Sequence, residues 1–275
     1  MIRYELPIGP WFEAFIQFLK DTFDGVFDAI RDALGFLIHQ LETGFTLLPW
    51  WLMIVLIAML VLWRSGKGLA LFGVLGLLMI EFTGLWHDTM LTVALVLVST
   101  AMALILAIPL GILAARNQAV EHVVRPLLDF MQTMPAFVYL IPAVTFFSLG
   151  IVPGAIATIV FAMPPSVRLT QLGIKQVPGE VVEAAQSFGA TPRQLLFKVQ
   201  LPIAMPTMLA GVNQTIMLSL SMVVIAAMIG APGLGRVVYG SIQSMAIGRA
   251  FEGGLAIVVI AILLDRLTHS FAQKR

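Results

Sequence analysis

Long apolar runs separated by short polar stretches make up most of this 275-residue chain. A helix needs roughly 20 mostly apolar residues to cross the hydrocarbon layer of a membrane. Runs of about that length predict seven membrane-spanning helices, near residues 46–63, 69–86, 90–114, 127–149, 152–167, 204–229 and 252–268. The alternating ten-residue segments of an outer-membrane barrel are absent from the sequence. The pattern therefore predicts an all-α integral membrane protein.

A different pattern precedes these runs. Residues 11–42 place apolar side chains at helical spacing on one face and charged side chains on the other. Residues 1–44 hold seven acids and three bases, whereas helices that bind the anionic inner leaflet are usually basic. We therefore predict that residues 1–44 form an amphipathic helix in the membrane interface on the external side. The same pattern also fits an ordinary helix that packs against its own subunit.

One polar stretch, residues 169–202, is much longer than the other connections and predicts two short helices. Pro178-Gly179 signals a turn before the first helix, and Gly189 suits the left-handed position that ends it. Thr191, Pro192 and Gln194 then match an N-cap, the first helical position and a capping box. Leu201-Pro202 is expected to stop the second helix, because a residue before proline avoids the helical region.

Lysine and arginine positions predict how the chain is oriented. If residues 169–202 are cytoplasmic, the predicted spans place eleven Lys and Arg residues inside and five outside, which accounts for all 16. Cytoplasmic connections carry an excess of these residues. We therefore expect the N-terminus outside and the C-terminus in the cytoplasm.

The polar stretch contains a motif with defined spacing. Glu183-Ala184-Ala185 is followed by three residues, Gly189, nine residues, an aliphatic residue, one further residue and Leu201-Pro202. This arrangement resembles the EAA loop of permease subunits from ATP-binding-cassette (ABC) importers. The resemblance implies the type I importer permease fold for residues 45–275, with residues 169–202 as the cytoplasmic coupling loop that docks on an ATPase. The coupling residues it implies are Glu183, Ala184, Ala185, Gly189, Thr191, Pro192, Arg193 and Gln194.

Further segments resemble one subfamily, the permeases for glycine betaine, proline and related quaternary-ammonium osmolytes such as choline, carnitine and trimethylamine N-oxide. They are residues 127–139, 161–165, 173–178, 197–202, 213–217 and 221–235. In that subfamily substrate choice rests largely with a separate binding protein. The resemblance also implies a homodimer with two ATPase subunits and an external binding protein, in a plasma or inner membrane.

The chain itself carries no motif for ATP. Ser65-Gly66-Lys67-Gly68 lacks both the earlier Gly and the following Ser or Thr of a P-loop. We therefore expect ATP and Mg²⁺ to be bound by a partner chain, and no cofactor or metal in this one. A net charge of +1 gives no reason to expect a nucleic-acid partner.

Polar groups inside membrane spans are costly and often mark a transport pathway. Methionines and aromatic rings also suit a quaternary ammonium group. The candidates that we expect along the pathway are Gln132, Met134, Tyr139, Asn213, Gln214, Met217 and Ser221. The competing interpretation is that such Asn and Ser side chains bond across helices. For Asp129 we expect a local ion pair with Arg125, four residues earlier.

Two other functions predict different sequence features. An ATP-independent osmolyte channel or ion-coupled carrier usually shows an internal repeat or an essential intramembrane charge pair, and neither is clear here. An intramembrane enzyme needs catalytic pairs within spans, but the histidines lie at span edges or outside: His39, His87, His122 and His269. The importer permease is the hypothesis that the sequence favours.

Overall fold

The computed structural model describes residues 7–273, and this part of the chain is helical. The α-helices are α1 (Ile8–Leu47), α2 (Trp50–Ser65), α3 (Lys67–Phe82), α4 (Trp86–Arg116), α5 (Gln118–Thr133), α6 (Leu140–Phe147), α7 (Ile151–Lys175), α8 (Gly179–Ser187), α9 (Pro192–Gln194), α10 (Leu201–Ala226), α11 (Leu234–Gln243) and α12 (Ile247–Gln273). Two 3₁₀ turns, η1 (Ala136–Tyr139) and η3 (Ala227–Ile229), and a π-helical segment, η2 (Leu195–Gln200), complete the order.

Four helices in the described residues are long and apolar enough to cross a membrane: α4, α7, the continuous run Pro192–Ile229 and α12. The count rises to six if each of two bent pairs, α1 with α2 and α5 with α6, is one span. The sequence predicted seven. The difference arises in part because α2 and α3 have 16 residues each, about 24 Å of helix against a hydrocarbon layer of about 30 Å.

The span predicted near residues 127–149 is broken in the structure. The chain bends by 111° between α5 and the helix that ends at Phe147. Met134, at the break, has extended backbone angles and precedes Pro135. Proline disfavours the helical region in the residue before it and has no N–H to donate, so α5 ends there.

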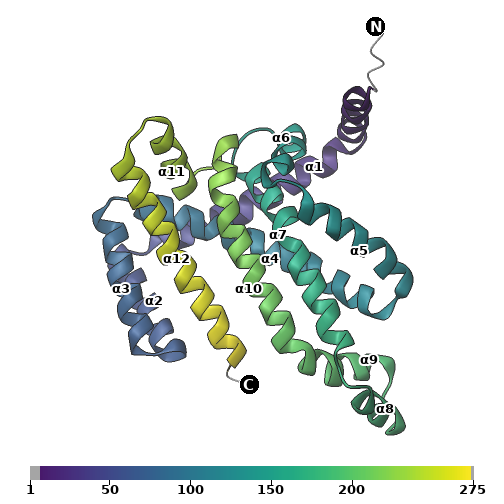
Figure 1. Cartoon of the computed structure of the whole chain (residues 1–275). Helices are drawn as coiled ribbons and strands as arrows, with labels where there is room; N and C mark the ends of the chain where they lie inside the picture. Colours follow the sequence, from purple (N-terminus) through teal and green to yellow (C-terminus); the bar gives the residue numbers. More distant parts are fainter. Residues whose placement is uncertain (1–6, 274–275) are drawn as a thin grey trace.

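Helix α7 lies at the centre of the molecule, packed between α4 and α10 (Figure 1). Glycines allow these backbones to approach closely. A Cβ at Gly111 of α4 would lie 2.7 Å from the carbonyl oxygen of Val167, and one at Gly211 of α10 would lie 3.1 Å from the Cα of Ser166. Small residues at membrane helix contacts serve this purpose generally.

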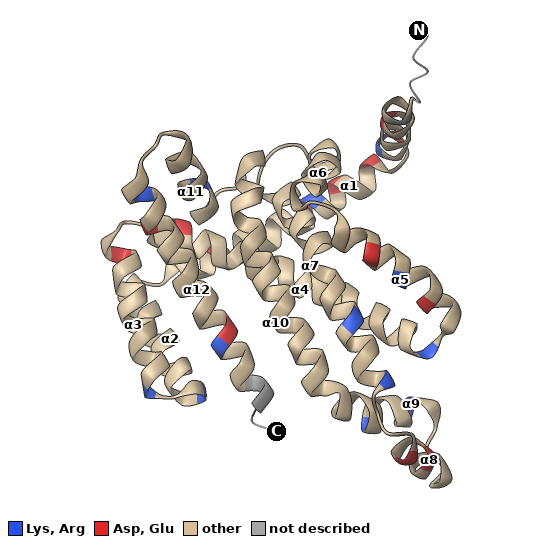
Figure 2. Cartoon of the chain, in the orientation of Figure 1, with Lys and Arg blue, Asp and Glu red and all other residues tan. Residues whose placement is uncertain are grey.

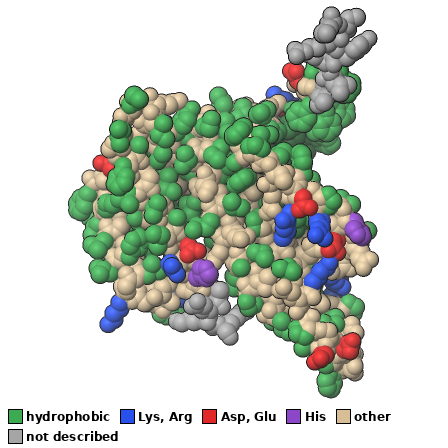
Figure 3. Space-filling view, viewed as in Figure 1, with side chains coloured by type: hydrophobic (Ala, Val, Ile, Leu, Met, Phe, Trp, Pro, Cys, Tyr) green, Lys and Arg blue, Asp and Glu red, His purple; other side chains and the backbone are tan. Residues whose placement is uncertain are grey.

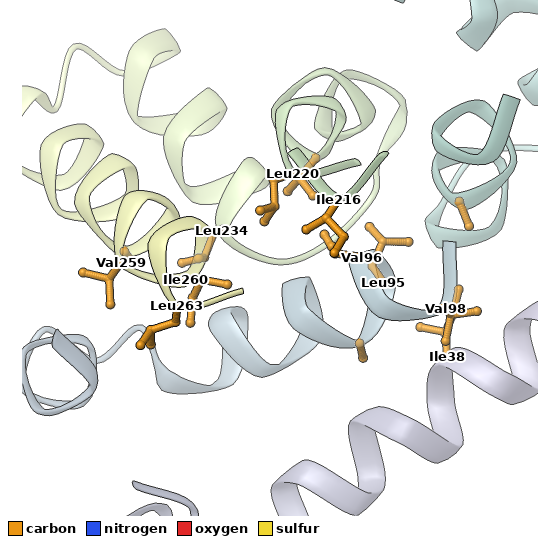
Figure 4. Close-up of a cluster of buried hydrophobic side chains, with 14 of the residues drawn as sticks. Ile38, Leu95, Val96, Val98, Ile216, Leu220, Leu234, Val259, Ile260 and Leu263 are labelled. Carbon is orange, nitrogen blue, oxygen red and sulfur yellow. The ribbon is translucent and has the colours of Figure 1, made fainter. Parts of the chain in front are cut away.

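A cluster of buried apolar side chains joins α4 and α10 to the C-terminal helices (Figure 4). Leu95 and Val96 come from α4, Ile216 from α10, and Ile260 and Leu263 from α12, and all are less than 10% exposed. The pair α2 and α3 lies beside α12 (Figure 1). Helices α2, α3 and α12 are therefore packed onto the central helices α4, α7 and α10 and do not form a separate unit.

The predicted amphipathic helix is confirmed as a helix, α1, with non-helical angles at Phe23. Its second half packs on this subunit: Leu34 and Ile38 are buried, and the ring of Phe27 stacks 4.4 Å from that of Phe146. Its first half is exposed and displays aromatic side chains such as Trp11, which is 64% exposed. The second half therefore follows the packing interpretation of the sequence, and the interfacial position of the first half stays a prediction.

Candidate functional site

The coupling loop projects from the end of the molecule opposite α1, where α8 and α9 lie beyond the ends of α7 and α10 (Figure 1). Acidic and basic residues gather toward this end on α5, α7 and α8 (Figure 2). Helix α7 continues to Lys175, so the first seven residues of the predicted stretch 169–202 belong to that helix. The projecting part begins after Lys175.

Helix α8 presents its side chains to solvent. It contains no buried residue, and both Glu183 and Ala184 are exposed while Ala185 is half-buried. The side chain of Phe188, directly after the helix, is 92% exposed. The sequence analysis did not single out Phe188.

The turn between the two loop helices has the geometry that the sequence predicted. Gly189 is left-handed, with φ of +80°, a conformation that glycine adopts without strain. The Gln194 N–H donates to the Thr191 hydroxyl at 3.3 Å, and the Thr191 N–H donates to the Gln194 side-chain oxygen at 2.9 Å. Pro192 occupies the first turn of α9. The predicted capping box is confirmed, and Arg193 lies exposed beside it.

The predicted stop at Leu201-Pro202 is wrong, because the helix continues through these residues into α10. The π-helical segment η2 explains how. The Leu201 N–H donates to the carbonyl of Leu196, five residues earlier, instead of four. This wider turn accommodates Pro202, which has no N–H and would clash with the carbonyl four residues before it in a regular α-helix. The loop is therefore joined to α10 by continuous helical backbone.

A cleft of about 560 Å³ separates the loop from the body of the protein. Val182 and Glu183 of α8 line one side, and Arg116 of α4 and Lys175 of α7 line the other. Leu195, at the start of η2, also contributes.

A second cleft, of about 590 Å³, lies between α5 and α7 and is lined by ion pairs. Lys175 Nζ donates to both carboxylate oxygens of Glu121 at 2.6 Å. This hydrogen bond holds the pKa of the Glu121 carboxyl below its ordinary value. Asp129 pairs with Arg168 of α7, so the structure places its ion pair across helices and not with Arg125. Both pairs join α5 to the central helix.

The predicted pathway residues do not form one group. Gln214, Met217 and Ser221 are exposed and follow each other at three- and four-residue steps along one face of α10. Gln132 and Gln214 line the α5–α7 cleft. Asn213 lies next to this exposed face but is buried.

Two of the candidates are packing residues. Tyr139 is buried, its hydroxyl donates to the carbonyl of Met131, and Met134 packs against the same small cluster. Other hydroxyls confirm the bonding across helices that the sequence left as an alternative. Thr100 donates to Ser219 at 3.1 Å, and the hydroxyls of Ser166 and Thr215 lie 2.7 Å apart. These bonds tie α4 and α7 to α10.

A third cleft, between α10 and α12, contains an acid that the sequence analysis did not single out. Asp265 lies in it with Asn213, Gln214, Met217 and Leu218. An ionisable residue near the end of the last apolar run is itself a signal that could have identified it.

These features define a polytopic membrane protein with an exposed, capped loop at one end. Residues 107–275 match the family described as "Binding-protein-dependent transport system inner membrane component". The chain belongs to this family and is a multi-pass membrane protein of the type I ABC importer permease fold.

Two relatives match over nearly the whole chain. The glycine betaine transport system permease protein OpuAB of Bacillus subtilis is 47% identical over 98% of this chain and 96% of its own length. The glycine betaine/carnitine transport permease protein GbuB of Listeria monocytogenes is 51% identical over 98% and 96%. A chain of the inward-facing MetNI methionine ABC transporter superposes with a TM-score of 0.60 at 22% identity, covering 66% of this chain and 91% of that one. This last likeness concerns the fold.

Proposed function

We propose that this chain forms the translocation pathway of an ATP-driven importer for glycine betaine or a related osmolyte, such as proline, choline, carnitine or trimethylamine N-oxide. The observation that carries the proposal is the exposed, capped loop joined to α10 by continuous helix. From Pro192 onward, α9, η2 and α10 form one continuous helical run, so a force that a partner applies there reaches the membrane directly, and α8 is joined to this run by the Gly189 turn. The relatives named for glycine betaine transport support the substrate class.

We also propose the assembly and its orientation. Two copies of this chain form the pore, two ATPase subunits bind ATP and Mg²⁺ and contact the coupling loops, and a binding protein delivers substrate from outside. The distribution of Lys and Arg supports a cytoplasmic loop, and α1 lies at the opposite end of the molecule (Figure 1). In this orientation the exposed first half of α1 lies in the outer membrane interface, where aromatic side chains are favoured.

Within this assembly, the exposed face of α10 with Gln214, Met217 and Ser221 is the part of the pathway that this chain contributes. The adjacent hydroxyls that bond α10 to α4 and α7 hold it in place. Polar and thioether groups alternate with apolar ones on this face, which suits a solute that has a charged end and a methylated end.

The test is a charge reversal in the coupling loop. We expect Glu183→Lys to leave ATP hydrolysis by the assembled transporter within about twofold of the original. We expect osmolyte uptake to fall at least tenfold, because the loop surface that faces the ATPase changes sign. Gly189→Pro should act similarly, since proline cannot adopt the φ of +80° found there.

Glu180→Lys is the matched control, because Glu180 is an exposed acid on the same helix. It should retain most uptake. Normal uptake by the Glu183→Lys and Gly189→Pro variants, with membrane insertion verified by yield, would contradict the role assigned to the loop.

A further inference from the structure

The cleft between α10 and α12 has a volume of about 440 Å³. Its lining residues are Asn213, Gln214, Met217, Leu218 and Asp265. Acidic, basic and histidine side chains gather on the visible surface over the lower part of α12 (Figure 3). Asn213 lies at the middle of α10, and Asp265 lies in the C-terminal part of α12. The cleft also opens beside Met217, on the exposed face of α10.

Asn213 has a buried acceptor without a partner in the described part of the chain. The residue is 8% exposed, and its side-chain oxygen accepts no hydrogen bond from residues 7–273. Thr215 and Ser219, close by on the same helix, bond to hydroxyls on α7 and α4. Buried polar atoms are almost always paired, so an unpaired one at the wall of a cleft points to an absent ligand.

Asp265 supplies a negative charge at the same cleft. Its side chain is 23% exposed. Nε2 of His269 lies 3.8 Å from one carboxylate oxygen and Nε of Arg266 lies 3.9 Å from the other, both beyond hydrogen-bonding distance. The side chain of Arg266 is 66% exposed, so solvent weakens its attraction for the carboxylate. Acids placed this way in membrane helices commonly mark the path of a cation.

We propose that Asp265, Asn213 and Met217 form a contact site for the quaternary ammonium group of the transported osmolyte. The inference rests on the proposed function and adds a specific position along the pathway. A quaternary ammonium has no N–H group, and it contacts its surroundings through methyl groups that carry a spread positive charge. A carboxylate attracts that charge, an amide oxygen accepts weak C–H contacts, and a thioether packs against the methyl groups.

The composition of the cleft favours an organic cation over a metal ion. A calcium ion takes six to eight oxygen ligands, and magnesium requires a near-ideal octahedron of them. Here Met217 and Leu218 provide apolar surface beside the three oxygen-bearing side chains. A single, partly solvated carboxylate also makes a weak site, which suits a position that substrate must leave quickly.

The first experiment removes the charge. Transporter carrying Asp265→Asn is reconstituted with its ATPase and binding protein, and ATP-dependent uptake of radiolabelled glycine betaine is measured. We expect the maximal uptake rate to fall about tenfold with basal ATP hydrolysis unchanged, and Asp265→Glu to restore at least half of it. Glu252→Gln is the matched control, because Glu252 is an acid on the same helix that pairs with Arg249 at 3.0 Å.

A second experiment reads the site without transport. The chain contains no cysteine, so Leu218→Cys places a single thiol at the cleft. We expect a methanethiosulfonate that carries a trimethylammonium group to modify it several-fold faster than the sulfonate analogue. Asp265→Asn should abolish this preference, and tetramethylammonium should slow the reaction. A cysteine at Leu172, which lines the α5–α7 cleft, should show the same reagent preference with or without Asp265→Asn.

The outcomes separate the two proposals. If the unsubstituted protein shows no ATP-dependent osmolyte uptake, that result contradicts the proposed function, whatever the rates of thiol modification are. ATP-driven uptake that is unchanged by Asp265→Asn overturns the contact site alone. Loss of uptake in both Asp265 variants, with equal thiol reactivity toward the two reagents, also overturns it, because Asp265 would then support the fold only.

Discussion

At the scale of single residues, the coupling loop depends on two positions with specific backbone chemistry. Gly189 adopts a left-handed conformation that costs other residues about 1 kcal/mol or more. Thr191 satisfies a free N–H of α9 with its hydroxyl. Both residues therefore act by fixing the shape of the loop itself.

We expect Thr191→Ala to destabilise the start of α9 by about 1 kcal/mol, because the Gln194 N–H loses its acceptor. Amide hydrogen exchange at Gln194 should become several-fold faster. Thr191→Ser, which keeps the hydroxyl, is the control and should exchange at close to the original rate. Equal protection in the alanine and serine variants would show that the cap contributes nothing.

Local chemistry of this kind could be predicted from the sequence, and contacts between distant residues could not. The capping box and the left-handed glycine depend on residues within four positions of each other. The ion pair of Asp129 depends on Arg168, 39 residues away on another helix, and the sequence pointed instead to the neighbouring Arg125. The same limit applies to Asp265, because only the packing of α12 on α10 brings it to Asn213.

At the scale of elements, prolines decide where helices break and where they continue. The chain bends at Pro135 but passes through Pro202. The sequence analysis predicted a stop at Pro202 and a span that runs through Pro135, and the structure shows the reverse. The π-helical segment before Pro202 makes a break there unnecessary, because its turn is wider by one residue. Periodicity thus predicted the helices, while their bends depended on backbone geometry that it does not report.

We expect Pro202→Ala to let η2 revert toward a regular α-helix, because residue 202 regains an N–H and the wider turn is no longer required. A regular α-helical turn in place of η2 would hold about one residue fewer, and this change would rotate α8 and α9 by about 100° relative to α10. Paired spin labels on Ser187 and Ala210 should report a changed distance, and more ATP should be hydrolysed per osmolyte transported. An unchanged distance and unchanged coupling would rule out this role for η2.

At the scale of the whole molecule, α7 and α10 connect the two ends. Both run from the region of α1 and α6 to the coupling loop, and both contact each other and α4 through small residues (Figure 1). The core cluster adds α12 to this group. A displacement of the loop therefore moves the helix face that carries Gln214 and Met217 together with the α10–α12 cleft.

The most direct test is transport by the complete system. The chain is reconstituted in proteoliposomes with separate ATPase and binding-protein subunits, and uptake of radiolabelled glycine betaine, choline, proline and trimethylamine N-oxide is measured in parallel. The account predicts uptake of at least one of these compounds that requires both ATP and the binding protein. Uptake that continues at the same rate without ATP would contradict it and would indicate an osmolyte channel or an ion-coupled carrier.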